Sequence, residues 1–295
     1  MKVLVIGGSG QTGHRLCEIL RQKDIEFLAP SRSELDIANA QALHDILNEF
    51  QPSMVVNCAG YRSLSRAEQE PSRCFAINRD AVAALADLCH AMGMVLIHLS
   101  SYLVFDGCKS DPYTEEDEPN PQGVLACSIW QGEQQIRDRC PRHIILRVGW
   151  VISARRENMV NRTLTALRLH KPIKVASDKL GNPTPAENVA KVFMTILYQL
   201  DCDAQVFGTY HYAGVEAVSE SKFNEVIYNE ASQFEDLPIN CINVVETEQL
   251  ERLRARRNDR LANRKILRTF GIHAKPWRTG LVRIMKKLYE RNSEA

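Results

Sequence analysis

The sequence contains no apolar run that approaches the roughly 18 residues of a membrane-spanning helix. Its apolar start, residues 1–7, is short for the apolar region of a signal peptide and ends at glycines. The nine cysteines form no CxxC pair and no Cys/His spacing typical of metal ligands. We therefore expect reduced thiols, no metal site, no membrane span and a cytoplasmic location.

Net charge is nearly absent as well, because 37 Lys and Arg residues stand against 36 Asp and Glu residues. A neutral total excludes a global field that would attract nucleic acid or a membrane surface. One local excess remains: residues 252–291 contain fourteen Lys or Arg residues but only two acids, Asp259 and Glu290. Solvated helix faces and contact with an anionic ligand both fit this excess, whereas RNA binding is disfavoured because aromatic residues are not interleaved.

Strand-like apolar runs alternate with helical patterns over the first 150 residues. The runs are residues 3–6, 27–29, 54–57, 95–99 and 143–147, and the helical patterns are 11–23, 38–50, 79–92 and 123–139. This alternation predicts an α/β fold, with a doubly wound parallel sheet of the Rossmann type over residues 1–150. The pattern loosens after residue 150, so we expect residues 151–295 to form a smaller, partly interleaved domain for a substrate or partner.

A glycine-rich turn follows the first predicted strand. Gly7, Gly10 and Gly13 have GxxGxxG spacing and open the first predicted helix together with Gln11 and Thr12. Without Cβ atoms, such a turn lets backbone N–H groups approach a pyrophosphate, and the helix N-terminus adds partial positive charge. The turn therefore predicts dinucleotide binding.

The end of the second predicted strand suggests which dinucleotide binds. No acid stands where the ribose hydroxyls of NAD are normally held, and Arg32 is there instead. An arginine can pair with a 2′-phosphate, so we favour NADP(H) over NAD(H), with a solvated surface arginine as the alternative. Further cofactor contacts are expected at the strand ends, from Asp36, Ile37, Cys58, Ala59 and Gly60.

Several segments together resemble one family. They include Gly10-Gln11-Thr12-Gly13, Leu35-Asp36-Ile37, Val104-Phe105-Asp106-Gly107, Gly132-Glu133 and Gly181-Asn182-Pro183-Thr184. With them the chain resembles the dTDP-4-dehydrorhamnose reductase family of extended short-chain dehydrogenases/reductases. The resemblance implies hydride transfer from a reduced nicotinamide to a ketone on a nucleotide-linked deoxysugar. It also implies substrate contacts from Trp150, Asn158 and Arg256.

The catalytic trio that this resemblance implies is a Ser or Thr, a Tyr and a Lys, which orient and protonate the carbonyl. By position these become Ser101, Leu125 and Ile129, and none of the eight tyrosines is followed four residues later by a lysine. Only the hydroxyl of Ser101 is retained. Tyr61 is the better placed substitute acid, since Tyr102 follows Ser101 in a strand and Tyr113 lies in an acidic loop.

We interpret the chain as an NADP(H)-binding protein whose reductase chemistry is lost or impaired and which acts as a binding or regulatory protein. The resemblance extends to the regulatory β subunit of methionine adenosyltransferase, a binding partner with this fold. One alternative is a nucleotide-sugar reductase with a non-standard proton donor, and another is a nucleotide-binding module without a redox cofactor. The expected partners are a dinucleotide, a nucleotide sugar or a protein, with a homodimer as a further expectation.

Overall fold

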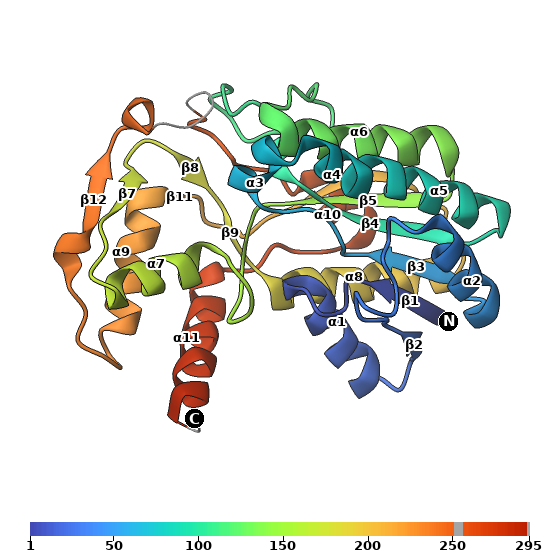
Figure 1. Cartoon of the computed structure of the whole chain (residues 1–295), viewed down its shortest axis with the longest axis horizontal. Coiled ribbons are helices and arrows are strands. Elements are labelled where there is room, and N and C mark those ends of the chain that lie inside the picture. The colour runs from blue at the N-terminus through green and yellow to red at the C-terminus, as the bar shows by residue number, and fades with distance from the viewer. Residues whose placement is uncertain (251–255, 294–295) are drawn as a thin grey trace.

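A six-stranded parallel sheet forms the centre of the molecule in the computed structural model, which describes residues 1–250 and 256–293 (Figure 1). The strand order is β10-β5-β4-β3-β1-β2, and every neighbouring pair is parallel. The strands are β1 (Lys2–Ile6), β2 (Glu26–Leu28), β3 (Met54–Asn57), β4 (Val95–Ser101), β5 (His143–Val148) and β10 (Gly208–Tyr212). The predicted doubly wound parallel sheet is confirmed.

Helices cover both faces of this sheet, because consecutive strand residues point to opposite sides and both sides are apolar. Val3 and Val5 of β1 pack in one core with α1, α8 and α10, and Leu4 and Ile6 pack in the other with α2, α5 and α6. In Figure 1, α5 and α6 lie above the sheet and α1 lies below it. These helices are α1 (Gln11–Gln22), α2 (Ala40–Phe50), α5 (Ala81–Ala91), α6 (Gly123–Arg139), α8 (Ala186–Asp201) and α10 (Arg264–Phe270).

A smaller unit lies beyond the carboxyl ends of the strands, at the left of Figure 1. It contains three two-stranded pairs and the helices α7 (Met159–Arg168) and α9 (Glu220–Ala231). Its core is aromatic, with Phe223 between Trp150 and Trp277. The pairs are β6 (Trp150–Ile152) with β9 (Pro183–Pro185), β7 (Ile173–Ala176) with β12 (Ile242–Val245), and β8 (Leu180–Gly181) with β11 (Val218–Ser219).

The chain crosses between the two units more than once. After α7 and β7 it returns to the sheet through α8 and β10, and α10 packs on β10. The last helix, α11 (Trp277–Ser293), contacts both β9 and α9 (Figure 1). A division of the sequence at residue 150 therefore separates β10, α8 and α10 from the sheet that they complete.

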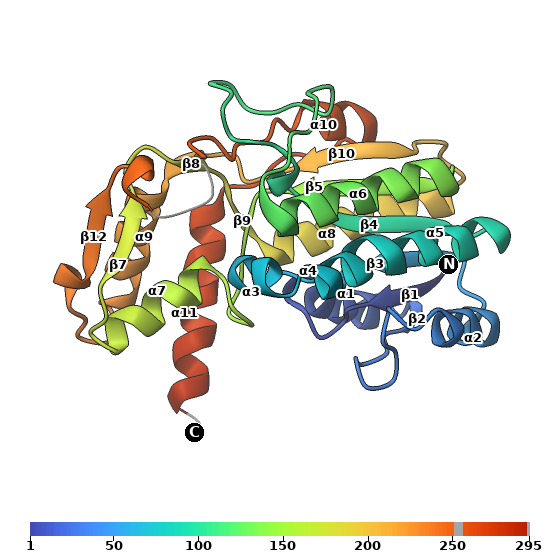
Figure 2. The same cartoon turned by 45° about the horizontal axis from the view of Figure 1, so that its top comes forward.

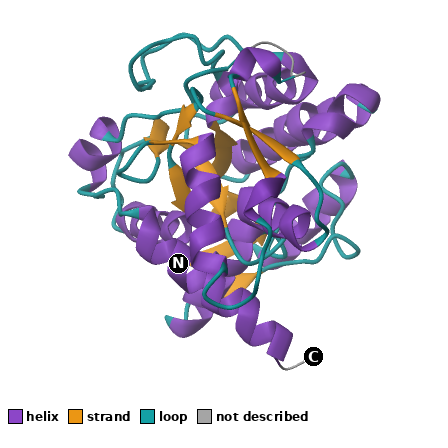
Figure 3. Ribbon diagram, turned by 90° about the vertical axis from the view of Figure 1, so that its left-hand side faces the viewer, coloured by secondary structure: helices purple, strands orange, loops and turns teal. Residues whose placement is uncertain are grey.

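The remaining elements are short. Helices α3 (Leu64–Gln69) and α4 (Pro71–Phe75) lead into a π-helical turn (Ala76–Asp80) and α5, and 3-10 turns occur at residues 102–104, 239–241 and 247–249. The loop between β4 and α6 lies over β10 and α10 in Figure 2. Figure 3 shows the strands enclosed by helices.

The cysteines and the apolar helices can now be placed. All nine cysteines are free thiols, and Cys17, Cys74, Cys89, Cys140 and Cys241 are buried. Within the part of the chain that the structure describes, no helix has both the length and the apolar character to cross a membrane.

A buried ion pair ties α6 to the sheet. Glu133 of α6 is 0% exposed, and both of its carboxylate oxygens accept hydrogen bonds from Arg147 of β5, at 2.7–3.2 Å. Arg137 donates a further hydrogen bond at 2.7 Å, and the Ser100 hydroxyl of β4 donates to the same carboxylate. Burial alone would raise the pKa of Glu133, but the two guanidinium groups lower it to about 2.

We predict that Glu133→Gln lowers the free energy of unfolding by about 3–5 kcal/mol at pH 7, because it leaves two guanidinium groups without a carboxylate. The pKa of Glu133 is depressed in the folded chain, so its contribution is complete above pH 4.5 and is lost as the pH falls towards 2. Urea unfolding across this pH range measures both effects. The surface change Asp87→Asn, which breaks the exposed pair with Arg139, should cost about 0–1 kcal/mol. A similar value for Glu133→Gln would contradict the prediction.

Candidate functional site

The glycine-rich turn joins β1 to α1 at the carboxyl end of the sheet. Gly7 has φ +82°, and a Cβ there would lie 2.6 Å from the backbone nitrogen of Ala59. A Cβ on Gly13 would lie 2.3 Å from the Gly7 carbonyl oxygen. Gly10 precedes α1 without a side-chain cap, so the first N–H groups of α1 remain available. The turn is therefore a cradle of backbone donors that fits a pyrophosphate.

The smaller unit reaches back to this turn. Gln11 accepts a hydrogen bond from the Ser153 hydroxyl at 2.8 Å, and Arg156 donates to the Ser9 carbonyl at 3.4 Å. Thr12 is buried at the start of α1. Gln11 thus connects the glycine-rich turn to the segment that follows β6.

The turn after β2 carries the predicted ribose contacts. Arg32 is exposed there, and the nearby acid Glu34 is engaged with the backbone N–H of Ser31 at 2.7 Å. Asp36 is exposed and accepts from the Ala38 N–H, while Ile37 is buried in the core. Arg32 is therefore the exposed basic group at this end of the crevice.

The segment after β3 is held in place by two asparagines. Asn57 accepts the Ala59 N–H at 3.0 Å, and Asn78 accepts the Tyr61 N–H at 2.7 Å and donates to its carbonyl. Asn78 also donates to the Ser128 hydroxyl of α6 at 2.9 Å. Cys58 continues the β1 ladder by donating to the Ile6 carbonyl, and burial raises the pKa of its thiol to about 12. The thiol therefore stays protonated and unreactive near neutral pH.

Arg62 reaches back over this segment. A Cβ on Gly60 would lie 3.3 Å from its Nε atom, which places the guanidinium at the carboxyl ends of β3 and β4. Among residues 1–250 and 256–293, none forms a hydrogen bond or ion pair with Arg62. It lines a small cavity of about 10 Å³ together with Gly60, Asn78, Ser100 and Ile129. The cavity has room for about one water molecule.

The two positions that the resemblance predicts for the phenol and the ammonium are apolar and buried. Leu125 is 2% exposed and Ile129 is 8% exposed, and both belong to one apolar cluster with Val104 and Phe105. They lie four apart on α6 and hence on one face of that helix. This face can neither donate a proton nor hydrogen-bond a ribose.

The hydroxyl groups near the crevice have separate partners. Ser101 ends β4, and its Oγ accepts the Leu103 N–H at 3.2 Å, whereas Ser100 points to the α6 side. The Tyr61 hydroxyl donates to Glu70 at 3.5 Å, and the Tyr113 hydroxyl donates to Asp106 at 2.7 Å. Tyr102 begins the 3-10 turn after β4, and burial raises its pKa. None of these contacts joins a phenol to Ser101.

The predicted substrate contacts have internal roles. Trp150 donates to one carboxylate oxygen of Asp259 at 3.0 Å, and Arg256 donates to the other at 3.0 Å. Arg256 also donates to the carbonyls of residues 102, 103 and 105, and Asn158 caps α7 by accepting the Val160 N–H. The structure thus brings Trp150 and Arg256 together at Asp259, and Asn158 lies apart from them. Of the predicted basic stretch, Arg252 and Arg254 lie outside the described residues.

Sequence reasoning placed the glycine-rich turn and the segment from Cys58 to Tyr61 at the crevice. It missed Arg62, Asn78 and Ser100 as lining residues. The available signal for Arg62 was its position, as a basic residue in the loop directly after the third strand. For Asn78 the available signal was the segment Ile77-Asn78, which also resembles the family.

His98 of β4 also lines the small cavity and is 6% exposed. Its Nδ1 accepts from the Asn57 amide nitrogen at 3.1 Å, because the Asn57 oxygen is used by the Ala59 N–H. Burial lowers the pKa of His98 to about 4. The histidine is therefore neutral near pH 7 and holds Asn57 in position.

We predict that the free energy of unfolding falls as the pH drops from 6.5 to 4, because the unfolded chain binds a proton at His98 before the folded chain does. The contribution of His98 is complete above pH 6.5 and amounts to on the order of 3 kcal/mol. His98→Gln retains a hydrogen-bond acceptor but does not titrate. In urea unfolding, its free energy of unfolding should therefore decrease less between pH 6.5 and 4, by about the contribution of His98. The part of the fall that arises from His211, whose pKa burial lowers to about 3, should remain. An unchanged pH profile in the variant would refute this role of His98.

Comparisons with known proteins point to one family. A family model described as the RmlD substrate binding domain matches residues 1–290. The dTDP-4-dehydrorhamnose reductase of Sinorhizobium fredii is 31% identical over 297 residues, which covers 100% of both chains. The solved dTDP-4-dehydrorhamnose reductase of Clostridium acetobutylicum superimposes with a TM-score of 0.88 at 26% identity, covering 98% of this chain and 99% of that one. The enzyme of Bacillus anthracis, solved in complex with NADP, gives a TM-score of 0.85 at 25% identity, covering 97% of this chain and 100% of that one.

Proposed function

The chain belongs to the RmlD substrate binding domain family, and on this premise we propose that it binds NADP(H) while its own reductase chemistry is lost or severely impaired. Its role is then that of a binding or regulatory protein that holds the dinucleotide and takes a nucleotide sugar or a protein as its partner. The observation that carries the proposal is the burial of Leu125 and Ile129 in one apolar cluster beside the crevice.

The residues at the crevice fit a dinucleotide. The backbone donors of the Gly7–Gly10 turn and of the start of α1 would hold the pyrophosphate, because no Cβ blocks their approach. Arg32 would pair with the 2′-phosphate that distinguishes NADP(H) from NAD(H). Asp36, Ile37 and the segment from Cys58 to Gly60 would line the remaining length of the cofactor.

Arg62 supplies a cation at the inner end of the same crevice. Its guanidinium has no partner among the described residues and lies beside Ile129, where hydrocarbon replaces the family's ammonium. A dinucleotide that enters here has no existing hydrogen bond of Arg62 to break. We therefore include Arg62 among the groups that hold the cofactor, although it cannot act as a proton donor at neutral pH.

The lost chemistry is the proton transfer. A bound reduced nicotinamide supplies a hydride, and the ketone oxygen that becomes a hydroxyl then needs a proton from a positioned acid. Leu125 and Ile129 cannot give or relay one, and the absence of a positioned general acid typically costs about 10²–10⁴-fold in rate. Ser101 can still orient a carbonyl, so binding is retained better than turnover.

A second candidate function is a working nucleotide-sugar reductase with a non-standard proton donor. The relatives favour it, because those named above are dTDP-4-dehydrorhamnose reductases over the full length of the chain. Tyr61 is the candidate donor, since it lines the small cavity and, among the described residues, its hydroxyl bonds to Glu70 alone, at 3.5 Å. The first proposal follows from the two residues of α6 and the second from the relatives as a whole.

We predict that NADPH binds to the wild-type chain and raises its melting temperature. Gly10→Val should abolish this binding, because the new side chain fills the cradle of N–H donors without requiring a forbidden backbone conformation. Arg62→Gln should weaken NADPH and NADH alike by about tenfold, whereas Arg32→Gln should weaken NADPH only. Nicotinamide fluorescence titration measures the affinity of each arginine variant for NADPH and for NADH.

Arg66→Gln is the matched control, because Arg66 is an exposed arginine of α3 that does not line the cavity. Its NADPH affinity should equal that of the wild type. If saturating NADPH caused neither a thermal shift nor a fluorescence change in the wild-type chain, the proposal would be wrong. The remaining hypothesis would be a nucleotide-binding module without a redox cofactor.

We predict that Leu125→Tyr combined with Ile129→Lys raises NADPH oxidation with dTDP-4-dehydro-6-deoxy-L-mannose by about 10²–10⁴-fold over the wild type. Each single variant should oxidise NADPH at close to the wild-type rate, because the phenol and the ammonium act as a pair. Absorbance at the reduced nicotinamide band follows the reaction, and circular dichroism checks that a lysine in the apolar cluster leaves the fold intact. Brisk wild-type turnover that Tyr61→Phe or Ser101→Ala removes would instead establish the second candidate.

A further inference from the structure

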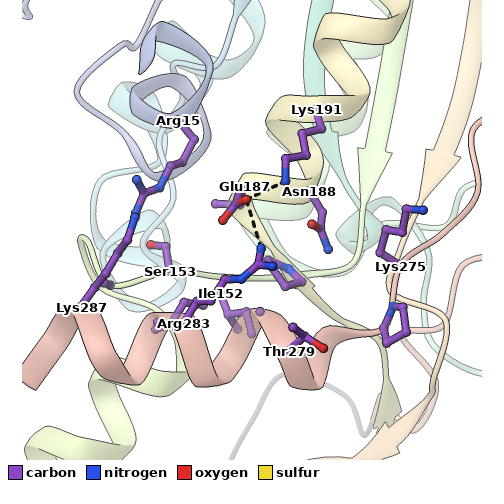
Figure 4. Close-up of a pocket in the computed structure, with 16 residues that line it drawn as sticks. Arg15, Ile152, Ser153, Glu187, Asn188, Lys191, Lys275, Thr279, Arg283 and Lys287 are labelled. Atoms are coloured by element: carbon purple, nitrogen blue, oxygen red, sulfur yellow. Dashed lines mark hydrogen bonds and ion pairs between the residues drawn. The ribbon is translucent and has the colours of Figure 1, made fainter. Parts of the chain in front are cut away.

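A second and larger cavity lies beside α1, which contributes Arg15 to its lining. Its volume is about 290 Å³, and it opens between α1, the first turn of α8 and the helix α11 (Figure 4). Its walls include the apolar residues Ile152, Pro185 and Ile284. This volume is at the lower end of the range for small-molecule sites, about 300–1,000 Å³.

Cations from separate helices meet at this cavity. Figure 4 shows Arg15 of α1 and Lys287 of α11 on one side, Lys191 of α8 and Arg283 of α11 in the middle, and Lys275 on the opposite side. The described lining contains one acid, Glu187. Arg15 is paired with Glu18 at 2.5 Å, outside the lining, so an excess of positive charge remains at the cavity itself.

Glu187 shows what kind of group the cavity accepts. Its carboxylate lies in the first turn of α8 and binds Lys191 at 2.6 Å and Arg283 at 3.4 Å (Figure 4). The helix has 16 residues and no side-chain cap at its N-terminus, and residues 185–188 line the cavity, so its first N–H groups lie at this space without a side-chain partner. The Glu187 carboxylate thus pairs with two of the five cationic side chains that line the cavity. Another of the five, Lys275, has no side-chain partner among the described residues.

We propose that this cavity binds a small polyanion of the diphosphate class, held by Lys191, Arg283 and Lys275 at the N-terminus of α8. Guanidinium and ammonium groups with helix N–H donors are the usual partners of phosphate oxygens. Glu187 occupies part of the site when the ligand is absent and competes with it for Lys191 and Arg283. The site is separate from the dinucleotide crevice, although Ser153 lines it and also donates to Gln11 of the glycine-rich turn.

Isothermal titration with inorganic pyrophosphate tests the site, with sodium chloride of equal ionic strength as the blank. The wild-type chain should bind pyrophosphate, and the double change Lys191→Gln with Arg283→Gln should weaken binding by at least about tenfold. Glu187→Gln should strengthen it, because both cations are released to the ligand. This gain cannot arise from a misfolded variant.

Two controls locate the binding. Lys222→Gln removes an equally exposed lysine, 56% against 57% for Lys191, that is also paired with a glutamate, and it should leave the affinity unchanged. Gly10→Val blocks the glycine-rich turn, so the pyrophosphate binding that this variant retains should be that of the cavity. Affinity for NADPH should be the same in the wild type and in the cavity variants. A failure of the pyrophosphate proposal can therefore be distinguished from a failure of the proposed NADP(H) binding.

Three results would each overturn the proposal. The first is heat no larger than that of the chloride blank. The second is an equal loss in Lys222→Gln and in the double variant, which would mean general surface screening. The third is loss of pyrophosphate binding in Gly10→Val, which would place the anion at the glycine-rich turn.

Discussion

The ion pair between Glu133 and Arg147 fixes how α6 lies on the sheet, and the character of the crevice depends on it. Glu133 is fully buried and gathers donors from β4, β5 and α6 itself. A charge cluster of this kind is stable only when every partner is present. It therefore fixes the rotation of α6 about its own axis and the position of α6 along the strands. This placement puts Ile129, which lies one helical turn before Glu133, against the carboxyl ends of β3 and β4.

The apolar pair on α6 is consistent with this rigid placement. A phenol and an ammonium at positions 125 and 129 would each need a polar partner, and removing one of them alone would strand the other. With both positions hydrocarbon, Leu125 and Ile129 simply extend the cluster that holds Val104 and Phe105. The helix keeps its position and its stability while its face toward the crevice becomes inert. A loss of proton transfer at this face would therefore leave the cofactor cradle intact, because the cradle is built from the backbone of a different βα unit.

Much of the sheet could be predicted from the sequence because buried parallel strands leave a strong local signal. The apolar run 3–6 became β1 (Lys2–Ile6), and the helical pattern 123–139 became α6 (Gly123–Arg139). The pairing of β10 (Gly208–Tyr212) with β5 could not be predicted, since it joins residues about sixty apart in the sequence. The glycine-rich turn could be found because its chemistry resides in the spacing of residues that are close in sequence.

The rest of the site depends on long-range contacts that no local pattern contains. Arg256 was predicted as a substrate contact, but its contacts to carbonyls about 150 residues away and to the carboxylate of Asp259 could not be read from the sequence. Arg62 belongs to a loop without periodicity, so only the fold shows that it turns back over Gly60.

The two anion-binding features of the molecule share one physical origin, the free end of a helix. The start of α1 faces the crevice and the start of α8 faces the larger cavity, and neither has a side-chain cap. The helices pack against each other below the sheet, so the two positive ends lie on the same side of the molecule and are joined through Gln11 and Ser153. At the crevice the positive end is matched by glycines and arginines that leave room for a ligand. At the cavity, Glu187 neutralises part of the charge from within the chain, which keeps a cluster of cations stable when no ligand is bound.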